Sequence, residues 1–178
     1  MIHRLLLTVI VALSLFRCTP KVSLTEQDVA TSWADMSLYI TKNTPANTPT
    51  YASRCLGYIG LTMYESVVPG FALYQSLAGQ LNGLESLPKP DPGKTYDWRL
   101  ALNAGQAHIL KRIYNQTSDA NKHRIDSLEA LVFQHFDETI TDKAVAERSV
   151  RFGRAVAQQI FEWAVRDGGH RAYLKNFD

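Results

Sequence analysis

The sequence has few cysteines. Only Cys18 and Cys55 occur in 178 residues, and two thiols cannot build the disulfide framework of a small secreted domain. Cys18 directly follows an apolar run at the N-terminus, which leaves Cys55 as a lone thiol. Because Cys55 lies in an apolar stretch, the sequence predicts a packed core cysteine there.

An excess of one charge sign is also absent. The first seventeen residues hold Arg4 and Arg17 and no carboxylate, so the rest of the chain carries 17 cations and 17 anions. A nucleic-acid interface needs clustered excess positive charge, so no nucleic-acid partner is expected. With 46% hydrophobic and 20% charged residues, the composition predicts one globular domain over residues 18–178 rather than a disordered tail.

Motifs of catalysis and of metal binding are missing. The chain contains no Gly-rich phosphate loop, no G-x-S-x-G and no C-x-x-C. His3 lies in the N-terminal run, and His123 and His135 stand twelve positions apart, far from the i, i+4 spacing by which two imidazoles share a metal. From motifs alone we predict no catalytic, cofactor-binding or metal-binding residue.

The remaining polar residues have structural interpretations. His108 lies on an amphipathic stretch, which predicts a hydrogen-bonded histidine between helices. Asp137 and Glu138, beside His135, are expected in a solvated turn before the next helix, where acidic residues favour a helix N-terminus. Asp97 and this acidic pair form no recognisable acid–base pair, because nothing in the sequence fixes their separation.

Residues 1–17 have the form of a secretory signal. Arg4 precedes an apolar run over residues 5–16, which is shorter than the roughly 20 residues that span a bilayer. A buried helix of the fold is the alternative. Cys18 and the polar residues after it resemble a bacterial lipoprotein signal, in which the cysteine is acylated, although Arg17 stands where a small residue is usual. We expect export to the periplasm, or anchoring to a membrane through lipid on Cys18.

Helical periodicity runs through the rest of the chain and predicts an all-α bundle of about five to six helices. No segment alternates with the period of a strand, and no repeat occurs. A capping box is expected at Ser23 and Glu26, and the second helix, apolar nearly all round, is expected to be central. The predicted helices cover residues 23–42, 49–67, 71–84 (a shorter one), 97–113, 118–136 and 141–167.

Three segments resemble a known family. Residues 29–70 contain a Trp33 helix, a loop with Pro45 and Pro49, then Ser53-Arg54 and Tyr64-Glu65. This order resembles the start of exported bacterial vanadium-dependent haloperoxidases, which are related to the type-2 phosphatidic acid phosphatases. Residues 87–110 are similar to the next helix of that family, and residues 149–169 to the long helix before its catalytic half.

The resemblance implies a scaffold without its catalytic half. The family's motifs are a lysine followed by Arg-Pro, then Ser-Gly-His, then an arginine with a downstream histidine; Arg-Pro and Ser-Gly-His are absent here. Gly168-Gly169-His170-Arg171 is a superficial echo that is better explained as a helix C-cap. The expectation is therefore an incomplete half, truncated at the C-terminus and inactive alone. Vanadate is implied only for a full-length relative, with halide oxidation or phosphate-ester hydrolysis as its reaction.

Two other interpretations remain open. The chain could be a self-contained exported lipoprotein that binds a partner or small ligand, or an enzyme built from scattered His, Asp and Glu. The scaffold interpretation differs from these because it predicts exposed apolar helix faces, which would bind the missing C-terminal half or a second copy.

Arg54 and Glu65 are the charged residues of the apolar second helix. They stand eleven positions apart and so share one face. Each needs a partner there, and Asp35 and Arg99 are candidates. A supporting role toward an oxyanion pocket is the alternative.

Overall fold

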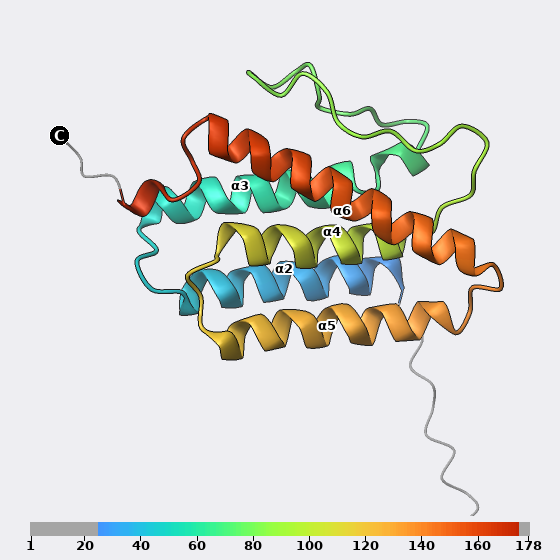
Figure 1. Ribbon diagram of the computed structural model, residues 1–178, viewed down its shortest axis with the longest axis horizontal. Helices are drawn as coiled ribbons and strands as arrows, with labels where there is room; N and C mark the ends of the chain where they lie inside the picture. The colour runs from blue at the N-terminus through green and yellow to red at the C-terminus, as the bar shows by residue number, and fades with distance from the viewer. Residues whose placement is uncertain (1–24, 175–178) are drawn as a thin grey trace, which may run out of the picture.

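The computed structural model describes residues 25–174, and these form an all-α bundle, as predicted (Figure 1). Successive helices run in opposite directions, and no strand occurs among the described residues. The five α-helices are α2 (Glu26–Asn43), α3 (Pro49–Glu65), α4 (Trp98–Ile113), α5 (Asp119–Asp137) and α6 (Lys143–Arg166), and the 3-10 turns are η1 (Val68–Gly70) and η2 (Ala172–Leu174). The predicted signal and Cys18 lie outside this range.

Helix starts follow the capping residues, with one correction. The N-cap of α2 is Thr25, whose hydroxyl accepts the Asp28 amide at 3.2 Å while the Asp28 carboxylate accepts the Thr25 amide at 2.7 Å. The capping box is therefore formed by Thr25 and Asp28 rather than by the predicted Ser23 and Glu26, because a Thr with an acidic residue three positions on provides the same reciprocal bonds. Ser23 lies outside the described residues.

Helix α4 is the centre of the bundle. It packs against α2, α3, α5 and α6, and all of its residues from Leu100 to Ala107 are buried. The prediction that the second helix is central was wrong: α3 buries Tyr51, Cys55 and Ile59 but leaves a face with Gly57 and Gly60 open. Although apolar residues occur on nearly all sides of α3, the helix is therefore not fully buried by the rest of residues 25–174.

Helices α4 and α6 cross at very short range. A Cβ atom at Gly153 of α6 would lie 1.9 Å from the carbonyl oxygen of Ala101, and one at Gly105 of α4 would lie 3.2 Å from the carbonyl oxygen of Gly153. Only a residue without a side chain fits such an approach. The close crossing of α4 and α6 therefore depends on glycine at position 153.

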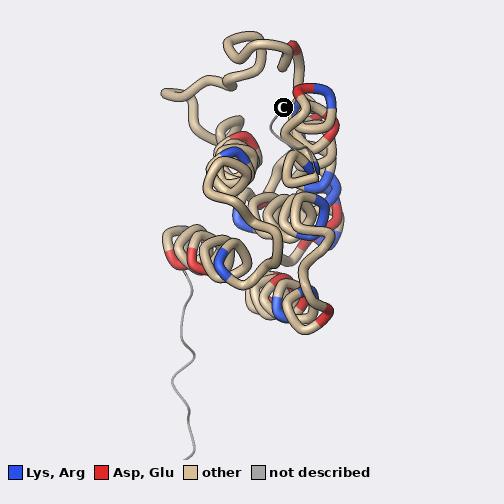
Figure 2. The backbone as a smooth tube through the Cα atoms, turned by 90° about the vertical axis from the view of Figure 1, so that its left-hand side faces the viewer, with Lys and Arg blue, Asp and Glu red and all other residues tan. Residues whose placement is uncertain are grey.

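Residues 71–84 are turns and bends instead of the predicted short helix. Gly79 and Gly83 have φ values of 77° and 76°, which break a helix. The buried Glu65 carboxylate also holds this segment, accepting the Ser76 hydroxyl at 2.8 Å and the Leu77 amide at 2.7 Å. Charged residues are spread over the helices, whereas most of the long loop between α3 and α4, which projects from the bundle, is uncharged (Figure 2).

No helix among residues 25–174 combines the length and apolarity needed to cross a membrane.

Candidate functional site

An open groove of about 450 Å³ runs along the outer face of α3. Gly57 and Gly60 form its floor, and a Cβ atom added at either would meet nothing within 4 Å. Its walls are mostly apolar and come from α3 itself, from the loop after α3 and from the end of α6: Leu61, Tyr64, Leu77, Leu81 and Trp163. Two glycines one helical turn apart, under an apolar groove, leave room for another helix to approach α3 closely.

A polar cluster closes one end of the groove. Tyr58 on α3 donates its hydroxyl to the Asp167 carboxylate at 2.7 Å, and the Arg54 guanidinium pairs with the same carboxylate at 2.9 Å. The Tyr58 ring meets the Trp163 ring edge-on at 5.5 Å. The cluster therefore joins the first half of α3 to the C-terminal end of α6.

The electrostatics of the cluster are those of a satisfied ion pair. Burial, with the Asp167 hydrogen bond, raises the pKa of Tyr58 to about 12, so the phenol remains a donor at neutral pH. The hydrogen bonds to Tyr58 and Asp167 raise the pKa of Arg54. Because the Arg54 charge is compensated by Asp167, this end of the groove does not offer a free cation to an anionic ligand.

Asp167 also organises the end of α6. Its carboxylate accepts the Gly169 amide at 2.9 Å, and Gly168 adopts a φ of 78°. A Cβ atom at Gly169 would lie 1.9 Å from the Tyr58 hydroxyl oxygen. Glycine is therefore required at position 168 by its positive φ and at position 169 by the close approach of Tyr58. The His170 amide donates to the Ala164 carbonyl at 2.9 Å, which confirms the predicted C-cap.

His170 belongs to the same cap. Its ring packs edge-on against Phe161 at 4.8 Å, and Arg112 lies over the Phe161 ring at 4.5 Å. Burial, with the charges of Arg171 and Arg112, lowers the pKa of His170. The neutral ring is consistent with a packing role at the end of α6.

Other residues singled out by the sequence are placed in the core or in helix contacts. The His108 Nε2 atom lies 3.0 Å from the Gln158 amide oxygen of α6, as predicted for a histidine between helices. Cys55 is fully buried, as predicted, and burial raises the pKa of its thiol to about 11. Of the two partners predicted for Arg54 and Glu65, Asp35 is exposed and Arg99 pairs with Asp97. Arg54 pairs instead with Asp167, and Glu65 bonds to the loop after α3.

The remaining acidic and histidine residues are not brought together. His123 is exposed, and the His135 ring packs edge-on against Phe136 at 4.9 Å. Asp137 pairs with Lys143 at 2.7 Å across the turn between α5 and α6. Among residues 25–174, no group of three His, Cys, Asp or Glu residues is placed to hold a metal ion.

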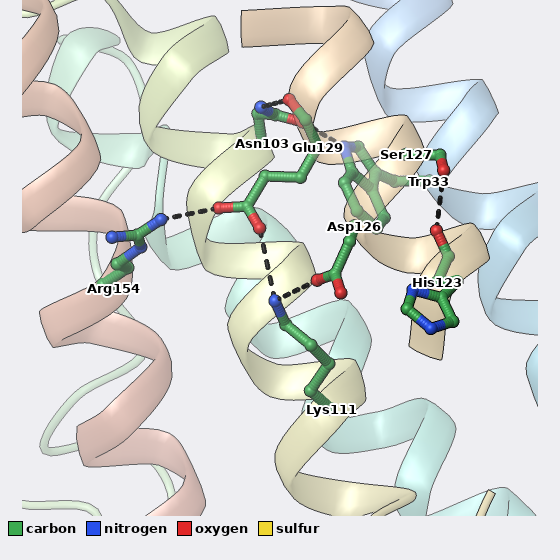
Figure 3. A network of polar contacts seen from close by, with 8 residues as sticks. All are labelled: Trp33, Asn103, Lys111, His123, Asp126, Ser127, Glu129 and Arg154. Atoms are coloured by element: carbon green, nitrogen blue, oxygen red, sulfur yellow. Dashed lines mark hydrogen bonds and ion pairs between the residues drawn. The ribbon is translucent and has the colours of Figure 1, made fainter. Parts of the chain in front are cut away.

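A second polar network, unforeseen from the sequence, ties the helices on the other side of the bundle (Figure 3). The Glu129 carboxylate of α5 pairs with Lys111 of α4 at 3.3 Å and with Arg154 of α6 at 2.8 Å. The Asn103 side chain of α4 links the backbone of α5 to α2. It donates to the Glu129 carbonyl at 2.9 Å and accepts from the Trp33 indole at 2.9 Å. The one feature of the sequence that indicated this network was Asn103, a polar residue at a core position of an otherwise apolar helix face.

The fold is similar to that of a solved bacterial vanadium-dependent iodoperoxidase. The TM-score is 0.63 and the sequence identity 27%, over 83% of this chain and 35% of that chain. The chain thus spans about a third of the length of the solved iodoperoxidase. No family model and no curated protein matches this chain.

The solved iodoperoxidase depends on vanadium, but the α3 groove of this chain does not fit vanadate. An oxyanion needs converging donors with uncompensated positive charge. Here the one cation at the groove, Arg54, is paired with Asp167 at 2.9 Å, and the rest of the lining is mostly apolar. The groove lining therefore matches apolar groups rather than a free oxyanion.

Proposed function

We propose that this chain is the helical scaffold of a vanadium haloperoxidase-like or acid-phosphatase-like exported protein, inactive by itself, whose catalytic half covers the α3 groove. The likeness to part of the solved iodoperoxidase supports the family relationship. The observation that carries the proposal is the open groove over Gly57 and Gly60, on a helix that is apolar nearly all round. Two surface glycines three positions apart would let a helix of the catalytic half pack closely on α3.

Contacts within the bundle hold both walls of the groove in place. Arg54, Tyr58 and Asp167 fix α3 to the end of α6, and Glu65 fixes the loop that forms the opposite wall. A preformed surface loses less conformational entropy when a partner binds. We further propose that Cys18 is the lipid attachment site, which would anchor the protein to the outer side of a membrane.

Self-association of the chain tests the proposal. Without its partner, the α3 groove should bind a second copy, and analytical ultracentrifugation should show a concentration-dependent dimer. Gly57→Glu places a charge on the groove floor and should shift the chain toward monomer, whereas Ala155→Glu on the exposed face of α6 should not. All three chains share the same N-terminal residues, so a difference reports the groove.

Two results would count against the proposal. If the parent chain stays monomeric into the millimolar range, the α3 groove does not bind a protein surface. A dimer that both variants weaken equally, or that neither weakens, forms through another surface.

A further inference from the structure

Three apolar side chains project from the start of the loop that follows η1. Leu73 is 94% exposed, Tyr74 63% and Phe71 43%, although each is an apolar or aromatic residue. The Tyr74 amide donates to the Phe71 carbonyl at 3.0 Å, and the two rings meet edge-on with centroids 6.4 Å apart. This tight turn, which we term the apolar tip (Phe71, Leu73, Tyr74), presents Leu73 to solvent.

The chain segment that carries the apolar tip is uncharged, although Glu85 and Lys89 share a cavity with Tyr74, and Arg99 shares one with Phe71. Residues 66–84 contain no Lys, Arg, Asp or Glu, so no side chain of this stretch keeps a charge in water beside the tip. Glu65, which precedes the stretch, is buried and bonded to Ser76 and Leu77. Burying the tip in an apolar medium would therefore desolvate no charge of its own segment.

The apolar tip lies at the end of the bundle where the chain enters it. Phe71 lines an apolar cavity of about 240 Å³ together with Gln27 and Val29, from the first turns of α2. Figure 1 shows the start of α2 and the end of α3 at this same end of the bundle, opposite to η2. Seven positions separate Cys18 from Thr25, and such a stretch reaches at most roughly 25 Å.

We propose that the apolar tip is a membrane-contacting surface, which inserts Phe71, Leu73 and Tyr74 into the interface of the lipid bilayer that carries the Cys18 anchor. The inference rests on the proposed anchoring at Cys18. A tether this short holds the tip beside the bilayer, and aromatic and aliphatic side chains on an uncharged turn are suited to the boundary between headgroups and acyl chains. The bundle would then stand on the membrane by this end, with the end of α6 directed away.

Fluorophore labelling of single cysteines tests the contact. The full chain, produced in a bacterium that acylates lipoproteins, is reconstituted on vesicles of phosphatidylethanolamine and phosphatidylglycerol. Leu73→Cys carries an environment-sensitive NBD label at the tip, and Leu174→Cys, 66% exposed at the opposite end, is the matched control. We expect blue-shifted emission and an at least about threefold lower quenching by a soluble quencher at position 73 only.

The parent chain separates failure of the contact from failure of the anchor. Cys55 is fully buried and should not react, so NBD labelling of the parent chain reports a free Cys18 and overturns the anchoring. Equal quenching at positions 73 and 174 overturns the contact. Protection of position 73 in a Cys18→Ser chain in buffer, without vesicles or detergent, also overturns it, because the tip is then covered by protein or by a second copy.

A second variant measures the contribution of the tip. Leu73→Ser should weaken vesicle binding roughly tenfold, since about one leucine side chain is no longer buried in lipid. Leu131→Ser, at a leucine 57% exposed on α5, should leave binding unchanged. Unchanged binding of Leu73→Ser would contradict the proposal, and because Leu73 makes little contact with the bundle, a folding defect is not expected.

Discussion

At the scale of single residues, glycines fix how closely the helices pack. Gly153 is in van der Waals contact with the backbone of Ala101, and no side chain fits between them. Gly57 is also a helical glycine, but a Cβ atom added there would meet nothing within 4 Å. The two positions therefore make a matched pair in which the same substitution should act in opposite directions.

We predict that Gly153→Ala lowers the free energy of unfolding by about 1–3 kcal/mol, because α4 and α6 must separate to admit the methyl group. Gly57→Ala should raise it by about 0.5–1 kcal/mol through helix propensity. Urea denaturation followed by circular dichroism measures both. Equal effects of the two substitutions would contradict the close crossing.

Buried ionisable hydroxyl and thiol groups should make the protein sensitive to alkali. Burial raises the pKa of Cys55 to about 11 and those of Tyr58 and Tyr114 to about 12, above ordinary values of about 8.5 for cysteine and 10 for tyrosine. The folded state therefore keeps protons that the unfolded state has lost. The stabilisation is complete below about pH 8.5 and is lost as the pH rises toward 12.

We predict a constant denaturation midpoint from pH 7 to 8 and a steady fall above about pH 9, with a slope of about 1.4 kcal/mol per pH unit for each proton retained. Tyr58→Phe loses the bonds to Asp167, which should cost about 1 kcal/mol at neutral pH, but should reduce the slope above about pH 10. Parallel pH profiles of variant and parent would show that Tyr58 does not titrate as described.

At the scale of elements, sequence periodicity predicted the helices but not the loop. The helix starts predicted at residues 49 and 97 agree with the structure to within one residue, because the N-caps found there, Thr48 and Asp97, act through local interactions. Residues 71–84 have enough apolar residues to suggest a helix. Their conformation depends instead on Glu65, whose hydrogen bonds to this segment form only in the folded chain.

We predict that Glu65→Gln loosens this loop, since the amide replaces one of two acceptor oxygens that bind Ser76 and Leu77. A hydrogen bond to a charged group contributes about 1.5–3 kcal/mol, so chymotrypsin should cleave within residues 71–84 at least about tenfold faster. Glu85→Gln, an exposed position in the same loop, is the control. Identical cleavage rates for both variants would show that Glu65 does not hold the loop.

The candidate site also lay beyond what the sequence could predict. The distance between Arg54 and Asp167 along the chain gives no hint that they pair at 2.9 Å. The available signals were Arg54 and Tyr58 one turn apart on α3 and the Asp-Gly-Gly end of α6. These signals single out the residues, but only the packing of α3 against α6 brings Arg54 and Tyr58 into contact with Asp167.

At the scale of the whole molecule, the bundle has two kinds of surface. Charged residues are dispersed over the helices, and Glu129 links α4, α5 and α6 through Lys111 and Arg154. The α3 groove and the apolar tip lack such charges over most of their area. We assign these two surfaces to a protein partner and to a membrane, respectively.

The central claim is that this chain is the helical scaffold of a haloperoxidase- or phosphatase-like protein. Sequencing the DNA beyond the codon for Asp178 tests it most directly. We expect an in-frame continuation that contains a lysine followed by Arg-Pro, and then Ser-Gly-His. A stop codon at that point, together with a monomeric chain whose α3 groove binds no second copy, would contradict it.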